Sequence, residues 1–378
     1  MPRASNAHIL VAASALLIIG CGSDPADDDG ATAGSGGAGG GSTSSNGGGG
    51  AGGADSLPGV DTTVTPFEAT HFYFTGDDNK RVNDAEATFP DEGLYERIIL
   101  HVSLDCPDGG CDPWDRVASL GIVSAKGTNG EPDTEIELAR FITPFHVKAA
   151  WDIDVTDLRP LLSGTVTLRG FIDTWVGPGS PYGDGWLLTA SFEMTGGVPE
   201  KRPVAVIPVW NRTSVIYGDP AKAIPGQVPA AEVTLPAGAS SFALRSLITG
   251  HGQGNADNCA EFCDREHTLT VGTAAHTQLV WRDDCETTAA PNQQGTWQYP
   301  RAGWCPGADV LPWIVDVTAD ISGGGSATFG YDVEAYENTC RPDSAVCTGC
   351  TLGTSCEYDG GAHTEPNYQV STLLIAYE

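Results

Sequence analysis

The chain has 378 residues, which is enough for two ordinary domains. Its 49 acidic and 19 basic residues give a net charge of −30, which argues against nucleic acid or an anionic membrane surface as a partner, because their phosphates would be repelled. The 11 cysteines are many for a cytosolic protein, and those other than Cys21 form an even number, consistent with disulfides made in an oxidising compartment.

Residues 1–21 have the pattern of a lipoprotein signal peptide. Arg3 precedes an apolar run over residues 9–19, which is short for a membrane span but suits the core of a signal peptide. Ile-Ile-Gly-Cys at 18–21 resembles a bacterial lipobox, whose cysteine is acylated. We expect an exported bacterial lipoprotein of the outer membrane, cell surface or periplasm, which meets a membrane only through the lipid on Cys21. The alternative is ordinary secretion with Cys21 free or bridged.

Residues 22–56 are almost wholly Gly, Ser, Ala, Thr and Asp. Such a composition cannot bury a core, so we expect a flexible, disordered tether between the anchor and the folded part.

From residue 57 onward the pattern favours an all-β fold. Short apolar or alternating runs are separated by Gly, Pro, Asp and Asn, without a long helical periodicity. The clearest expected strands are 70–75, 97–104, 117–123, 135–142, 165–175 and 187–194. This spacing is typical of a β-sandwich or jelly roll.

An internal repeat divides this region in two. Residues 154–175 read like residues 316–336, with Asp-Val-Thr, a Gly/Ser turn and a β-rich run in both. A second pair is 98–115 and 242–261, where an apolar run leads to a close cysteine pair with a carboxylate. We therefore expect two copies of one β-unit, at 57–198 and 203–378.

The most informative stretch is Cys-Pro-Asp-Gly-Gly-Cys-Asp-Pro-Trp-Asp-Arg at 106–116. A bridge from Cys106 to Cys111 would fix a small turn and present Trp114 and Asp115 at its exit. Apolar contact raises a carboxyl pKa and a nearby cation lowers it, so Asp115 is a candidate acid or base. The alternative from these residues alone is a braced turn with a surface Asp.

This stretch and five later blocks resemble the bacterial peptide-N-glycosidase F family, amidases that remove N-linked glycans from asparagine. The other blocks, in order, are ARFITPF (139–145), DVTDLRPLLSG (154–164), DTWVG (173–177), CAEFC (259–263) and RAGWCPG (301–307). The resemblance implies two packed eight-stranded antiparallel jelly rolls. It also implies that Asp115 is the main catalytic carboxylate, and that neither a cofactor nor a metal is needed.

Two more carboxylates match catalytic positions of the family. Glu261 lies in Cys-Ala-Glu-Phe-Cys, where a bridge between Cys259 and Cys263 would hold it rigidly. Asp173 alternates with Phe171 and Trp175, so it is expected either in a buried network or facing a pocket. The family has Glu at this position, and a carboxylate that is one methylene shorter puts turnover or substrate choice in question.

A cation and several aromatic rings accompany these carboxylates. Arg301 matches the family and would stabilise charge or donate to a substrate carbonyl, with a structural salt bridge as the alternative. Sugar rings pack on aromatic faces, and we expect substrate contacts from Trp114, Trp175, Phe262 and Trp304, with core packing as the alternative for each. Phe262 replaces the family's Trp. The resemblance also implies a disulfide between Cys285 and Cys305.

The region 340–361 looks like a cysteine-rich insertion relative to the family. It contains Cys340, Cys347, Cys350 and Cys356, which in an exported chain favour two disulfides over a zinc site.

The leading hypothesis is a hydrolase that converts glycosylated Asn to Asp and acts on N-linked glycoproteins or glycopeptides. A second hypothesis is a glycan-binding surface lipoprotein of the same fold without turnover, which the departures at Asp173 and Phe262 motivate. A third is a protein like the copper hydroxylases that share paired jelly rolls. The eight histidines show no adjacent or alternating pair that would favour copper.

Overall fold

The protein is described from a computed structural model, over residues 57–128, 130–254, 259–321, 325–339, 357–358, 361–362 and 365–378. The expected signal peptide, Cys21, the tether at 22–56 and the four cysteines of the insertion lie outside these residues. Within them, no helix combines the length and the apolar character of a membrane-spanning segment.

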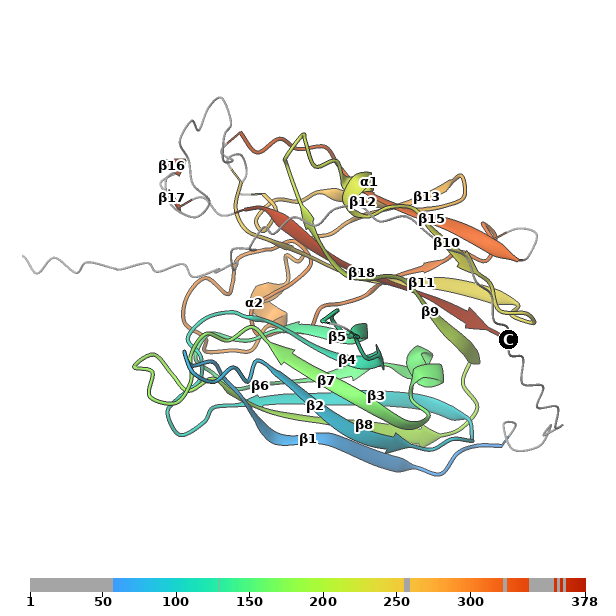
Figure 1. Cartoon of the computed structure of the whole chain (residues 1–378), viewed down its shortest axis with the longest axis horizontal. Coiled ribbons are helices and arrows are strands. Elements are labelled where there is room, and N and C mark those ends of the chain that lie inside the picture. The colour runs from blue at the N-terminus through green and yellow to red at the C-terminus, as the bar shows by residue number, and fades with distance from the viewer. Residues whose placement is uncertain are drawn as a thin grey trace, which may run out of the picture. The chain divides into compact units, whose positions relative to one another are not determined.

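The first eight strands form two four-stranded antiparallel sheets, coloured blue to green in the lower half of Figure 1. They are β1 (Thr62–Phe72), β2 (Val82–Phe89), β3 (Tyr95–Asp105), β4 (Val117–Ala125), β5 (Thr134–Ile142), β6 (Ala149–Asp154), β7 (Gly164–Ile172) and β8 (Trp186–Gly196), with a 3-10 helix at Thr156–Leu161. The orders are β1-β8-β3-β6 and β2-β7-β4-β5.

The remaining strands form a second pair of four-stranded sheets and a separate two-stranded sheet, in the upper half of Figure 1. The elements, in chain order, are β9 (Pro203–Ile216), α1 (Ile224–Gln227), β10 (Ala231–Thr234), β11 (Ser241–His251), β12 (Glu266–Val271), β13 (Ala274–Leu279), α2 (Cys285–Thr288), β14 (Trp313–Asp316), β15 (Ser326–Val333), the short pair β16 (Glu357–Tyr358) and β17 (Gly361–Ala362), and β18 (Asn367–Tyr377). The orders β14-β11-β18-β9 and β10-β15-β12-β13 repeat those of the first domain strand for strand. The repeat seen in the sequence is therefore one topology used twice.

Alternating side chains build each core. In β3 the buried residues Ile98, Leu100, Val102 and Leu104 point to one face, and β8 lies antiparallel beside it, with Leu100 opposite Phe192. Because successive side chains in a strand point to opposite faces, such runs bury one complete face. The all-β, two-domain prediction is confirmed. One strand is shorter than expected, because β7 ends at Ile172 and not at Trp175.

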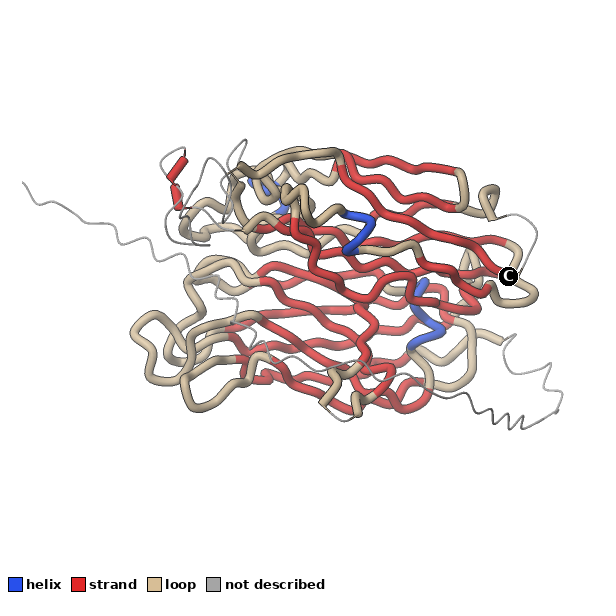
Figure 2. Tube along the Cα trace, turned by 45° about the horizontal axis from the view of Figure 1, so that its top comes forward, coloured by secondary structure: helices blue, strands red, loops and turns tan. Residues whose placement is uncertain are grey.

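The two domains share a packed seam, visible in Figure 2 as adjoining layers of strands. Leu373, Ile375 and Tyr377 of β18 belong to the core cluster of the first domain. The edge of β5 also pairs with a loop of the second domain, through Ile142 N–H to Ala308 O (3.0 Å) and Val310 N–H to Arg140 O (2.9 Å). These bonds place the loop around residues 301–310 next to the end of the first domain where β5 ends.

Candidate active site

The cysteine loop after β3 positions Asp115. Cys106 and Cys111 form a disulfide with Cα atoms 4.4 Å apart. The next residue, Asp112, is fully buried, and its carboxylate accepts hydrogen bonds from Trp114 N–H (3.0 Å), Thr174 Oγ1 (2.6 Å) and Arg116 Nε (3.1 Å). Three bonds to one buried carboxylate fix the backbone just before Asp115, at the point where β4 begins.

Asp115 lies beside a cation of the second domain. Its Oδ2 is 3.8 Å from Nη2 of Arg301, and 21% of its side chain is exposed. Burial raises the pKa of Asp115 to about 6, although the charges of Arg301 and Arg116 act in the opposite direction. A carboxyl group with such a pKa exchanges protons near neutral pH.

Glu261 is held on a second crosslinked loop, which follows β11. Cys259 and Cys263 form a disulfide with Cα atoms 4.9 Å apart. The backbone of Glu261 donates to Gly252 O (3.0 Å) and accepts from Ala302 N–H (2.9 Å). Its Oε1 accepts from Arg301 Nε at 3.2 Å, and 16% of the side chain is exposed. Burial raises the pKa of Glu261 to about 7, with the Arg301 charge opposing this rise and the Asp115 charge adding to it.

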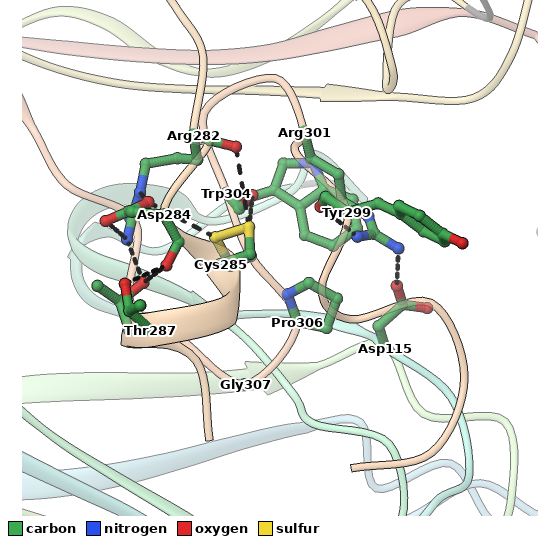
Figure 3. The surroundings of a disulfide bond; sticks show 12 residues. Asp115, Arg282, Asp284, Cys285, Thr287, Tyr299, Arg301, Trp304, Pro306 and Gly307 are labelled. Carbon is green, nitrogen blue, oxygen red and sulfur yellow. Dashed lines mark hydrogen bonds and ion pairs between the residues drawn. A yellow bond between two sulfur atoms is a disulfide. The ribbon is translucent and has the colours of Figure 1, made fainter. Parts of the chain in front are cut away.

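Arg301 joins the two carboxylates. Its guanidinium is 1% exposed, and besides the two acids it donates to Thr296 O, Thr296 Oγ1 and Tyr299 O. The rings of Phe262 and Trp304 lie 5.0 and 4.8 Å from its Cζ. Figure 3 shows Arg301 reaching Asp115 from the loop that the Cys285–Cys305 disulfide closes. With its donors engaged in this way, Arg301 holds the acids in place and sets their charge.

Two of the three predicted carboxylates therefore come together from distant parts of the chain. Asp115 belongs to the first domain, whereas Glu261 and Arg301 belong to the second, and one guanidinium contacts both acids. The charge of Asp115 adds to the rise in the pKa of Glu261, so the two carboxyl groups interact electrostatically.

The carboxylate of Asp173 has a different partner from those of Asp115 and Glu261. The backbone N–H of Asp173 donates to the carbonyl oxygen of Val117 (3.0 Å), and Val117 is two residues after Asp115 in the chain. The Oδ1 of Asp173 is 3.2 Å from Arg81 Nη1, and 41% of the side chain is exposed. Asp173 is thus neither buried nor in contact with Arg301, and its catalytic role remains a prediction.

The four aromatic residues expected to contact substrate lie in different settings. Trp114 and Trp175 are half-buried, with Tyr182 beside Trp114 (ring centroids 5.8 Å apart) and Arg81 over Trp175 at 4.1 Å. Phe262 is half-buried beside Arg301. The prediction that Trp304 contacts substrate is wrong. Its side chain is buried, with 3% of the residue exposed, and its indole N–H donates to Gly250 O (2.7 Å). The ring of Trp304 packs against the guanidinium of Arg301, and it is too buried to contact a sugar.

Two residues that position the site were not identified from the sequence. Asp112 has no role in the sequence analysis, although a carboxylate between Cys111 and Pro113 is well placed to accept N–H groups of the following residues. Arg81 lies 92 residues from the Asp173 that it contacts, and no local pattern signals that pairing. Among the described residues, no group of three or more His, Cys, Asp or Glu could hold a metal ion.

Comparisons with known proteins agree with this geometry. Family models described as peptide-N-glycosidase F, N terminal and C terminal, match residues 64–180 and 221–351. The amidase F of Elizabethkingia miricola, named for peptide-N(4)-(N-acetyl-β-D-glucosaminyl)asparagine, is 31% identical over 278 residues, covering 70% of this chain and 75% of that protein.

Solved structures show the same fold. PNGase F, described as a glycosylasparaginase from Flavobacterium meningosepticum, superposes with a TM-score of 0.68 at 26% identity, covering 85% of this chain and 96% of that chain. PNGF-II is 18% identical with a TM-score of 0.60, covering 84% of this chain and 65% of that one, and it supports the fold alone. With both domain models matched in order and the paired acids in place, the chain belongs to the peptide-N-glycosidase F family.

Proposed function

We propose that this protein is an amidase that hydrolyses the bond between the side-chain carbonyl of a glycosylated asparagine and its amide nitrogen. Asn becomes Asp, and the glycan leaves as a glycosylamine. The observation that carries the proposal is the convergence of Asp115 and Glu261 on Arg301, with both carboxyl pKa values raised toward neutrality. N-linked glycoproteins or glycopeptides are the substrates, in line with the name of the relative from Elizabethkingia miricola.

The paired acids suit the two proton transfers of amide hydrolysis. Water needs a base to become nucleophilic, and the departing nitrogen needs an acid. Near neutral pH the ionised Asp115 can take the proton from water, while the protonated Glu261 can donate one. Unequal pKa values in one site are what such a division of roles requires. Arg301 keeps the pair from becoming wholly protonated.

The direct test is incubation of the purified protein with an N-glycosylated peptide. We expect a released glycan and a peptide that contains Asp. This peptide is heavier than the same peptide with unglycosylated Asn by the difference between a carboxylic acid and an amide. The same peptide without glycan should keep its Asn, which controls for spontaneous deamidation. Binding of the glycopeptide without conversion would contradict the amidase function and favour the glycan-binding hypothesis.

The pH dependence of kcat/KM follows from the need for an ionised Asp115 and a protonated Glu261. We expect kcat/KM to rise as pH passes about 6, where Asp115 ionises, and to fall above about 7, where Glu261 loses its proton. The two limbs belong to the coupled pair. Glu261→Gln should lower the rate and remove the decrease in kcat/KM above about pH 7, because the Gln side-chain amide does not titrate. Steady-state rates on a glycopeptide measure this, and an unchanged falling limb in that variant would assign the limb to another group.

We further propose export and lipid anchoring at Cys21, with the protein at the outer membrane, cell surface or periplasm. The apolar run at 9–19 and the lipobox-like 18–21 support this proposal. The three disulfides among the described residues agree with an oxidising compartment. The net charge of −30 supports the absence of nucleic acid among its partners.

A further inference from the structure

A groove of about 570 Å³ lies between the two domains. One wall is the face of the first domain at β7 and β5, with Phe171, Arg169 and Glu135. The other wall is the edge strand β9, with Asn211 and Ser214. None of the residues placed in the active site above lines this groove.

One end of the groove, at Phe171, lies two residues from Asp173. Phe171 pairs with Val82 of β2 and with Ser119 of β4. Asp173 is two residues beyond Phe171, just past the end of β7. Its N–H donates to the carbonyl oxygen of Val117, which is two residues from Asp115 in the chain. Two residues of a strand span ~7 Å. Phe171, at one end of the groove, is therefore linked to Asp115 through Asp173 and Val117, and a glycan that extends from Asp115 past Asp173 would reach this end of the groove first.

The cations that line the groove are already engaged. Arg169 donates to Asp84 (2.7 and 2.8 Å) and to Asp133 (2.7 Å). Arg212 donates to Gln369 Oε1 (2.9 Å) and Ser119 Oγ (3.1 Å), and its Cζ lies 5.1 Å from the Phe171 ring. These guanidinium groups are committed to protein acceptors, so the groove is poorly suited to a phosphate, sulfate or carboxylate ligand.

The remaining groups suit a neutral ligand rich in hydroxyls. Asn211, Ser214 and Thr134 are exposed and offer amide and hydroxyl groups. Glu135 is half-buried, and burial together with the Glu137 charge raises the pKa of its carboxyl group. It can accept hydrogen bonds from hydroxyl groups, and the edge of Phe171 adds an apolar contact.

We propose that this groove binds the outer, uncharged sugars of the glycan while the sugar attached to asparagine occupies the catalytic pair. The proposal rests on the proposed function, and it assigns a preference for long neutral glycans over short or acidic ones. The pairing of the groove's cations with protein groups and the net charge of −30 disfavour glycans that end in carboxylated or sulfated sugars.

Ser214→Trp tests the proposal because Ser214 is exposed on β9 and lines the groove, so an indole there fills it. One peptide is prepared with either the core disaccharide or a long, mannose-rich glycan. We expect kcat/KM for the long glycan to fall about tenfold, through KM, with the disaccharide unchanged. Thr277→Trp, also exposed but on β13, is the control and should change neither. An equal loss on both substrates, or no loss on either, overturns the proposal.

Direct binding separates this proposal from the amidase function. A free mannose-rich oligosaccharide is titrated calorimetrically into the Asp115→Asn protein, with and without Ser214→Trp. We expect binding that the Trp weakens about tenfold. If the wild type hydrolyses neither glycopeptide, the amidase proposal fails, and this titration still decides whether the groove binds sugar. Undetectable binding, or equal binding with and without the Trp, overturns the groove proposal.

Discussion

Asp115→Asn is expected to lower kcat/KM for glycan release by about a thousandfold or more, with the fold intact. Asn keeps the shape of the side chain and its polar contact with the Arg301 region, but it cannot take a proton from water near neutral pH. Loss of a general base costs ~10²–10⁴-fold, and loss of the negative charge beside Arg301 adds to this. The measurement is release of glycan from a denatured glycoprotein.

Asp108→Asn is the matched control for this variant. Asp108 belongs to the same disulfide loop but is exposed, so the same change of chemistry should leave the rate within about twofold of the wild type. Thermal unfolding of both variants checks the fold. Release at the wild-type rate by Asp115→Asn would remove Asp115 from the reaction and with it the proposed mechanism.

The strand framework could be predicted because burial imposes a period of two on the sequence. The alternating run of β3 shows this clearly, and the turn residues between runs mark where strands end. Ends of strands are harder to place. Phe171, Asp173 and Trp175 alternate beyond Ile172, but the ladder stops there because Thr174 turns its N–H to Ile172 O. A pattern of side chains does not report that change in the backbone.

Contacts between the domains could not be predicted from the sequence. In β5 every residue from Ile136 to Ile142 is buried, because one face meets its own domain and the other meets the second. Glu137 and Arg140 look like ordinary surface charges in the sequence, yet both lie inside the protein. The same lack of information explains the wrong prediction for Trp304. Its aromatic side chain suggested contact with a sugar, but it is buried against the guanidinium of Arg301 and supports that group.

Arg140→Met is expected to lower the free energy of unfolding by about 3–5 kcal/mol, because it leaves a charge buried without its partner. Arg140 and Glu137 are both buried, and two hydrogen bonds of 2.8 and 2.6 Å join them. Arg140 also donates across the seam to Thr249 Oγ1 (2.8 Å) and Gln369 O (2.9 Å). Urea denaturation measures the loss. Arg202→Met, at a surface ion pair with Glu378, is the control and should cost less than ~1 kcal/mol.

The double variant Glu137→Leu/Arg140→Met separates the cost of the orphaned charge from the value of the pair. Replacing both partners with apolar groups removes the buried charge, so most of the stability should return. Activity need not return with it, since Asp115 and Arg301 come from opposite domains and the Arg140 bonds across the seam help to hold them 3.8 Å apart. We therefore expect the double variant to be more stable than Arg140→Met but still about tenfold less active than the wild type. A double variant no more stable than Arg140→Met would show that the bonds to Thr249 and Gln369, and not the pairing of charges, hold the seam together.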